Sequence, residues 1–294
     1  MLPVKEGYIS FKRYRVYYKI VGRQTDELKL PILVIAGGPG SPHNYLLDLQ
    51  QLAQNDRQVI FYDQLGSGKS GKPTDNSIWS VGLFIEELET LRQKLKLDDI
   101  YILGHSWGGM LAIDYMLTKP SGIHGLILAS SMVSMPLFRE EMAKLRKSLP
   151  KGVNDILDKY EANGNFDDPK YKQAYAVFTK KHIFRGEEWP PHLNSPHNPF
   201  GDNVYRTMWG ANEAYPNGSL KNWDRLDRLK EISVPTLITS GQYDELTPLQ
   251  AEMTKTRIPN SKQIIFKESG HMPHVEEPGS YRNQVEIFLE NIER

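Results

Sequence analysis

Short, continuous runs of apolar residues recur along the chain, and each is followed by a loop rich in glycine or polar residues. The runs cover residues 31–35, 58–63, 100–103, 125–130, 234–240 and 263–267. A strand buried on both faces of a parallel sheet has such a continuous run, because helices cover both of its faces. The pattern therefore predicts a mostly parallel sheet.

Other stretches have different periods. Residues 7–11 and 14–20 carry β-branched and aromatic side chains with partial alternation, which predicts two antiparallel strands with a wetter face. Apolar residues at helical spacing predict helices between the buried runs, at 45–53, 85–97, 110–117 and 281–292. Strands that alternate with helices favour an α/β fold with helices on both faces of the sheet.

The alternation stops between about residues 132 and 231. This segment has no buried-strand run, and its apolar spacing predicts helices at 137–149, 153–161 and 170–181, with proline-rich loops at 189–191 and 195–199. We interpret residues 132–231 as a helical cap domain inserted into an α/β core domain formed by residues 1–131 and 232–294.

Composition narrows the range of partners. The 294 residues include 36 Lys and Arg and 36 Asp and Glu, so the formal net charge is zero. A balanced charge argues against nucleic acid or an anionic membrane surface as the main partner, and it fits a short peptide or aminoacyl substrate. The chain has no cysteine, which excludes disulfides and thiolate metal sites, and we expect no metal or cofactor.

The amino terminus lacks the basic and apolar regions of a signal peptide, and no apolar run approaches the roughly 18 residues of a spanning helix. We therefore expect a soluble, cytoplasmic protein. The sequence leaves its oligomeric state open.

The central motif is Gly104-His105-Ser106-Trp107-Gly108, which lies between a buried strand and a predicted helix. A Gly-x-Ser-x-Gly motif at a strand-to-helix turn is typical of a nucleophile elbow. The glycines let the backbone fold tightly, and we expect the Ser106 hydroxyl to be exposed above the sheet edge.

Two further residues follow the last two buried runs. Asp244 comes after the first and His271 after the second, and the chain order Ser, Asp, His is that of the α/β-hydrolases. Each residue would lie at the carboxyl end of a strand, where the crevice of such sheets opens. A serine hydroxyl needs a base, so we assign His271 as the base and Asp244 as its partner. His274 is the competing base.

An oxyanion needs hydrogen-bond donors, and the candidates are the backbone N–H groups of Trp107 and Gly38. Gly38 belongs to a glycine-rich loop at residues 36–42 that follows a buried strand. A second loop, at residues 64–70, superficially resembles a phosphate-binding loop, but it lacks the glycine that the Walker A spacing requires. We interpret it as a structural turn near the site.

Together these motifs resemble the proline iminopeptidase family of capped α/β-hydrolases, in particular its tricorn-interacting aminopeptidase branch. The resemblance is carried by residues 37–40, 61–70, 104–109 and 241–245, together with cap residues between 203 and 224. It implies removal of an unblocked amino-terminal residue from short peptides, with Ser106, Asp244 and His271 as the triad.

The resemblance also implies an ammonium site. A partly buried ammonium group is costly unless carboxylates surround it, and Glu213 and Glu245 match the acidic residues that hold the substrate amino terminus in the family. The alternative is that both are solvated surface charges. The family usually has His where this chain has Ala36, so we expect a less rigidly held oxyanion loop and higher turnover when that His is restored. An amino-acid amidase, a carboxylesterase and a ligand receptor with vestigial turnover remain alternative functions.

Overall fold

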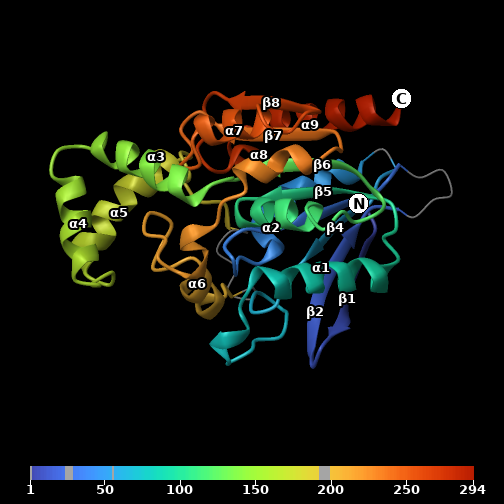
Figure 1. Cartoon of the computed structure of the whole chain (residues 1–294), viewed down its shortest axis with the longest axis horizontal. Coiled ribbons are helices and arrows are strands. Elements are labelled where there is room, and N and C mark those ends of the chain that lie inside the picture. The colour runs from blue at the N-terminus through green and yellow to red at the C-terminus, as the bar shows by residue number, and fades with distance from the viewer. Residues whose placement is uncertain (1, 24–28, 55, 192–198) are drawn as a thin grey trace.

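A computed structural model describes residues 2–23, 29–54, 56–191 and 199–294 (Figure 1). Within these ranges the strands form one sheet in the order β1-β2-β4-β3-β5-β6-β7-β8. In chain order they span Val4–Phe11, Tyr14–Val21, Ile32–Ile35, Val59–Tyr62, Ile100–His105, Ile123–Ala129, Thr236–Gly241 and Ser261–Phe266. Strand β2 is antiparallel to β1 and β4, and the pairs from β4 to β8 are parallel. The predicted mostly parallel α/β sheet is confirmed.

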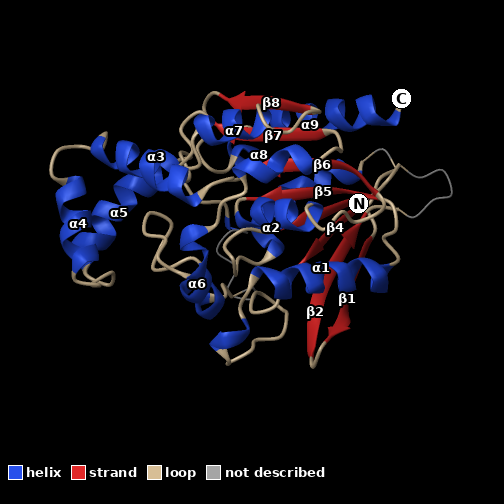
Figure 2. Cartoon of the chain, viewed as in Figure 1, coloured by secondary structure: helices blue, strands red, loops and turns tan. Residues whose placement is uncertain are grey.

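Helices fill most of the intervals between strands (Figure 2). The α-helices α1 to α9 span Val81–Leu95, Trp107–Met116, Met135–Lys147, Val153–Ala162, Pro169–His182, Asp202–Met208, Pro248–Lys255, Pro273–Glu276 and Pro278–Glu293. The 3-10 helices η1, η2, η4 and η5 span His43–Ala53, Asn76–Ile78, Ser219–Asn222 and Leu226–Glu231.

Most predicted elements lie within a few residues of the observed ones. Helix α1 begins at Val81 rather than at residue 85, because the Ser80 side chain caps it by accepting a hydrogen bond from the Leu83 N–H at 3.2 Å. The stretch predicted as a helix at 45–53 is a 3-10 helix, η1. Helices α6, α7 and α8 were not predicted. The predicted loop at 195–199 lies outside the described residues except at Pro199.

Successive residues of the central strands point to opposite faces of the sheet. In β5, Ile100 and Ile102 belong to one apolar core, while Tyr101 and Leu103 belong to a second core. The first core includes side chains of α1 and α2, and the second includes side chains of η1 and α9. Both faces are therefore covered, which explains why these strands have continuous apolar runs.

The chain between β6 and β7 supplies helices α3 to α6. Figure 1 shows α3, α4 and α5 beyond one end of the sheet. The described residues of this segment form one isolated bridge, between Ser134 and Asp224, and no longer strand. None of the described helices combines the length and the apolar character that a membrane span requires.

Four loops leave the sheet at the same edge, because β3, β5, β7 and β8 all run parallel. They carry, in chain order, Gly38, Ser106, Asp244 and His271. The fold thus brings to one edge of the sheet residues that are far apart in the sequence, with 233 positions between Gly38 and His271.

Candidate active site

Ser106 connects β5 to α2 through a strained turn. Its backbone has φ 56° and ψ −122°, in a region that a side chain rarely adopts. A Cβ on Gly104 would lie 2.3 Å from the Gly108 carbonyl oxygen, and a Cβ on Gly108 would lie 2.1 Å from the Ile35 carbonyl oxygen. Both glycines are thus required by close backbone approach, as the elbow motif predicts.

The expectation of an exposed Ser106 hydroxyl is wrong. The residue is only 9% exposed, and it lines a cavity of about 330 Å³ that also includes Ile183, Trp189 and Phe200. These three residues come from the segment between β6 and β7, so they cover the elbow from the side opposite the sheet. The cavity also reaches Gly38, Glu213 and His271.

The structure pairs Asp244 with His271. The Nδ1 of His271 lies 2.8 Å from Oδ1 of Asp244, which also accepts a hydrogen bond from the Leu246 N–H at 2.9 Å. His274 lies elsewhere, with Nε2 3.2 Å from the carbonyl oxygen of Tyr45. The geometry therefore supports His271 over His274 as the partner of Asp244.

His271 is also fixed through its backbone. Its N–H donates to the Ile183 carbonyl oxygen at 2.9 Å, which connects the loop after β8 to the end of α5. No hydrogen bond joins Ser106 Oγ to His271 within the part of the chain that the structure describes. Such contacts are commonly long before substrate binds and tighten in the reacting complex.

The charges around His271 favour its protonated form. Burial opposes the imidazolium, but the adjacent Asp244 carboxylate outweighs burial, and Glu245 and Glu213 add to its effect, raising the pKa of His271 to about 9. Without a bound cation, the imidazole therefore holds a proton at neutral pH.

Glu213 and Glu245 do not occupy the same kind of position. Glu213 is partly buried and lines the cavity, whereas Glu245 is 1% exposed and does not line it. Within the described residues, Oε2 of Glu245 has no hydrogen-bond partner. Burial raises the pKa of both carboxyl groups, and the charge of Glu213 raises that of Glu245 further. Neither side chain is a fully solvated surface charge, so that alternative is wrong.

The loop after β3 brings the backbone of Gly38 to the cavity. Gly38 lines it with φ 106°, and a Cβ there would lie 2.6 Å from the Gly40 nitrogen. Trp107 does not line the cavity, but it begins α2 directly after Ser106. In the described ranges, neither Gly38 nor Trp107 donates its backbone N–H to a protein acceptor.

This loop is well held despite Ala36. The Gly37 N–H donates to the Tyr45 hydroxyl at 2.8 Å, and Nε2 of Gln64 donates to the Ala36 carbonyl oxygen at 2.8 Å. The Ala36 side chain is buried in the apolar core that contains Tyr45 and Leu46. The structure thus supplies other anchors where the family resemblance led us to expect a loose loop.

The loop at 64–70 is a structural turn, as predicted. Oε1 of Gln64 accepts from the indole N–H of Trp107 at 2.9 Å, so the Gln64 side chain joins the glycine-rich loop to the first residue of α2. Oδ2 of Asp63 accepts from the Lys69 N–H at 2.8 Å, which closes the turn on itself. These bonds use the polar groups that a phosphate would otherwise need.

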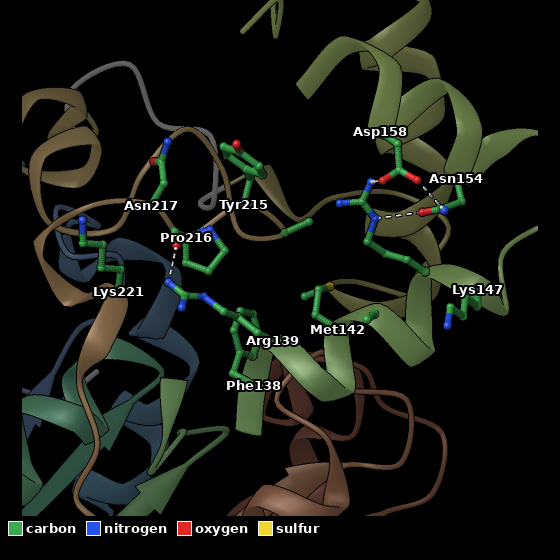
Figure 3. A pocket seen from close by; sticks show the side chains of 13 residues that line it. Phe138, Arg139, Met142, Lys147, Asn154, Asp158, Tyr215, Pro216, Asn217 and Lys221 are labelled. Carbon is green, nitrogen blue, oxygen red and sulfur yellow. Dashed lines mark hydrogen bonds and ion pairs between the residues drawn. The ribbon is translucent and has the colours of Figure 1, made fainter. Parts of the chain in front are cut away.

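A larger cavity, of about 570 Å³, lies between α3, α4 and residues 214–217 (Figure 3). Its lining residues include no serine or histidine. Arg146 turns toward Asp158 and Asn154, and Arg139 donates to the Pro216 carbonyl oxygen at 3.3 Å. The lining of this cavity therefore contains no serine and histidine pair like that of Ser106 and His271. Nowhere in the described residues do three or more His, Asp or Glu side chains form a group able to hold a metal ion.

Sequence reasoning missed the residues that brace the site. Tyr45 and Gln64 each hold the glycine-rich loop, and His105 contacts Tyr45 through Nδ1 at 2.9 Å. Tyr45 is one of the apolar positions of a predicted helix, and Gln64 lies in a turn, so neither has a pattern that signals its partner. His105 occupies a variable position of the elbow motif, where the motif itself makes no prediction.

Comparison with known proteins agrees with this geometry. Residues 31–278 match the alpha/beta hydrolase fold family. The proline iminopeptidase of Heyndrickxia coagulans is 42% identical over 263 residues, covering 89% of this chain and 91% of the relative, and that of Lactobacillus delbrueckii subsp. lactis is 39% identical over 292 residues, covering 98% and 99%. The crystal structure of the Mycobacterium smegmatis proline iminopeptidase superposes with a TM-score of 0.88 at 31% identity, covering 98% of each chain. The chain therefore belongs to the proline iminopeptidase family of serine α/β-hydrolases.

Proposed function

We propose that this protein is a serine aminopeptidase that releases an unblocked amino-terminal residue from short peptides. The observation that carries the proposal is that Glu213 lines the same cavity as Ser106 and His271, so a carboxylate faces the space where a scissile bond would lie. Because its relatives are named proline iminopeptidase, we expect proline to be the residue that this protein releases.

In the proposed reaction, Oγ of Ser106 attacks the carbonyl carbon of the first residue while Nε2 of His271 takes the hydroxyl proton. Asp244 holds Nδ1–H of His271 and stabilises the imidazolium. The imidazolium then gives its proton to the departing amine, which leaves an acyl-enzyme. A water molecule, deprotonated by His271, releases the free amino acid and restores the Ser106 hydroxyl.

The backbone N–H groups of Gly38 and Trp107 are the proposed oxyanion donors. Each lacks a protein acceptor in the described part of the chain, and the two flank Ser106 from different strands. A preorganised donor of this kind contributes on the order of 3 kcal/mol to the transition state.

The substrate ammonium would also prepare the base. Asp244 is the largest contributor that raises the pKa of His271 to about 9, and Glu245 and Glu213 add to it, so the imidazole is protonated and unable to accept the Ser106 proton at neutral pH. An ammonium group placed beside Glu213 offsets the charge of that carboxylate and so lowers the pKa of His271. Binding of the correct substrate would therefore favour the neutral imidazole that attack requires.

Residues 132–231 fit the role of a cap domain. They contribute Glu213 and the cavity residues Ile183 and Phe200, whereas Ser106, Asp244 and His271 come from loops of the sheet. The division into core and cap, and a cytoplasmic location, stay predictions.

A panel of matched substrates tests the proposal. Prolyl and alanyl anilides with a free amino group should be hydrolysed, and their N-acetylated counterparts should be hydrolysed at least 30-fold less efficiently, because the blocked amine has no charge to place beside Glu213. The Ser106→Ala variant serves as the blank. Equal hydrolysis of free and acetylated substrates would instead identify a general amidase or esterase.

A further inference from the structure

A chain of buried hydrogen bonds runs behind Ser106, from the oxyanion loop to the base. It begins at the Gly37 N–H, which lies 2.8 Å from the Tyr45 hydroxyl oxygen. The same hydroxyl lies 2.9 Å from Nδ1 of His105, and Nε2 of His105 lies 2.9 Å from the carbonyl oxygen of His271. Three loops of the site thus meet at two side chains that line the cavity but do not belong to the Ser106, Asp244 and His271 set.

The protonation states of His105 and Tyr45 determine the donor and the acceptor of each hydrogen bond between Gly37 and His271. Burial and the electrostatic effect of the neighbouring His271 and His274 lower the pKa of His105 well below its usual value, so its ring is neutral and carries one N–H. The carbonyl oxygen of His271 can only accept, so that hydrogen is on Nε2. Nδ1 is therefore an acceptor.

The tyrosine must then donate. Burial raises the pKa of Tyr45, which keeps its phenol protonated, and its O–H donates to Nδ1 of His105. The Tyr45 oxygen accepts the Gly37 N–H in turn. The hydrogen bonds therefore all run in one direction, from Gly37 through Tyr45 and His105 to His271. Each donor and acceptor among them has a partner.

The residues that form these hydrogen bonds are also closely packed against one another. A Cβ on Gly37 would lie 2.9 Å from the Tyr45 hydroxyl and 3.1 Å from Cβ of Ser106, so the loop is held directly between the tyrosine and the nucleophile. The His105 ring packs at 4.8 Å from the His271 ring and 5.3 Å from the Tyr45 ring, measured between centroids. His105 is covalently joined to Ser106.

We propose that Tyr45 and His105 are positioning residues that hold the Gly38 donor and the His271 base in place relative to Ser106. The inference rests on the proposed serine-hydrolase chemistry, though not on the choice of peptide as substrate. It also explains how this chain orders its oxyanion loop with Ala36, whose side chain carries no polar group, at the start of that loop.

The variant Tyr45→Phe tests the inference, because it removes one oxygen and leaves the Gly37 N–H and Nδ1 of His105 without partners. Misplaced oxyanion donors weaken the transition state more than the ground state, so kcat should fall roughly 10- to 100-fold with KM changed less than threefold. Since ester and amide transition states share the oxyanion, the loss should be similar for a prolyl anilide and for p-nitrophenyl acetate.

The matched control is Tyr115→Phe. Tyr115 is also buried and hydrogen-bonded, to Arg92 and Glu89, but it lies on α2 away from the cavity. It should lose stability in urea without losing kcat. A second measurement is the cycle of Tyr45→Phe, His105→Ala and the double variant, in which the two losses of kcat should be strongly non-additive because both break the same chain.

Retention of kcat within twofold in folded Tyr45→Phe, a loss confined to KM, or additive effects in the cycle would each overturn the inference. The acetate ester separates this outcome from failure of the proposed function. If the wild type does not cleave free-amino anilides but Tyr45→Phe still loses ester turnover, the aminopeptidase assignment fails and the positioning role stands.

Discussion

Replacing Glu245, whose buried carboxyl group lies near His271 and Glu213, should have opposite effects on two kinds of substrate. Glu245→Gln removes the negative charge that this group carries when it is ionised and keeps its shape. A substrate with a free ammonium loses one partner of a desolvated charge pair, which costs about 2 kcal/mol or more and lowers kcat/KM at least 30-fold. Glu213→Gln should lower it similarly, since Glu213 lines the cavity itself.

A neutral ester such as p-nitrophenyl acetate should respond in the other direction. The rise of the His271 pKa from 6.5 to about 9 corresponds to roughly 3 kcal/mol of preference for the imidazolium. Asp244 is the largest favourable contributor, so Glu245 accounts for only part of that preference. Its removal should move the acidic limb of the pH profile to lower pH, by less than the full rise of the His271 pKa, and so raise ester turnover at pH 7.

The assay is kcat/KM from pH 5 to 10 for a prolyl anilide and the acetate ester. The matched control is Glu252→Gln, which makes the same charge change at an exposed position on α7. Equal losses on both substrates, or an acidic limb that stays in place in Glu245→Gln, would refute the reasoning and leave the carboxylate a structural role.

Three further outcomes are expected. Ser106→Ala should abolish turnover of both substrates while the urea midpoint changes little, because it removes one oxygen from a turn; residual activity would exclude Ser106 as the nucleophile. Burial raises the pKa of Glu87 to about 8, so stability should fall as pH rises from about 4.5 to 8, and Glu87→Gln should remove that slope in urea titrations at pH 5 and 9. Ala36→His should lower stability in thermal unfolding and leave turnover no higher, since the buried side chain has no space to grow.

The sheet could be predicted because its strands are buried on both faces. Residues 31–35 and 100–103 have no polar side chain to break the run, so the strands β3 and β5 stand out in the sequence. Helix α7 was missed because its eight residues, Pro248–Lys255, mix apolar and polar side chains without a clear stripe. The true start of α1 was present in the sequence as a capping serine, Ser80, five residues before the start that the apolar spacing predicted.

The acid, base and nucleophile of the candidate site follow strands, and strand ends are visible in the sequence. The Tyr45 to His105 contact joins residues 60 positions apart, and the contact from His105 to His271 joins residues 166 apart. Such pairings depend on how neighbouring loops pack once the sheet has formed. The burial of Ser106 has the same origin, since the residues that cover it come from the segment between β6 and β7.

The hydrogen bond from the His271 N–H to the Ile183 carbonyl oxygen has a consequence for protein engineering. A protein engineer could exchange the segment between β6 and β7 for that of a relative in order to change substrate preference. Such an exchange assumes that the segment is structurally independent of the residues that carry the base. Ile183 belongs to that segment, whereas His271 belongs to the loop after β8, so every transplant also replaces the acceptor of the His271 N–H. A chimera should therefore retain turnover only when the incoming segment presents a backbone carbonyl at the place of Ile183.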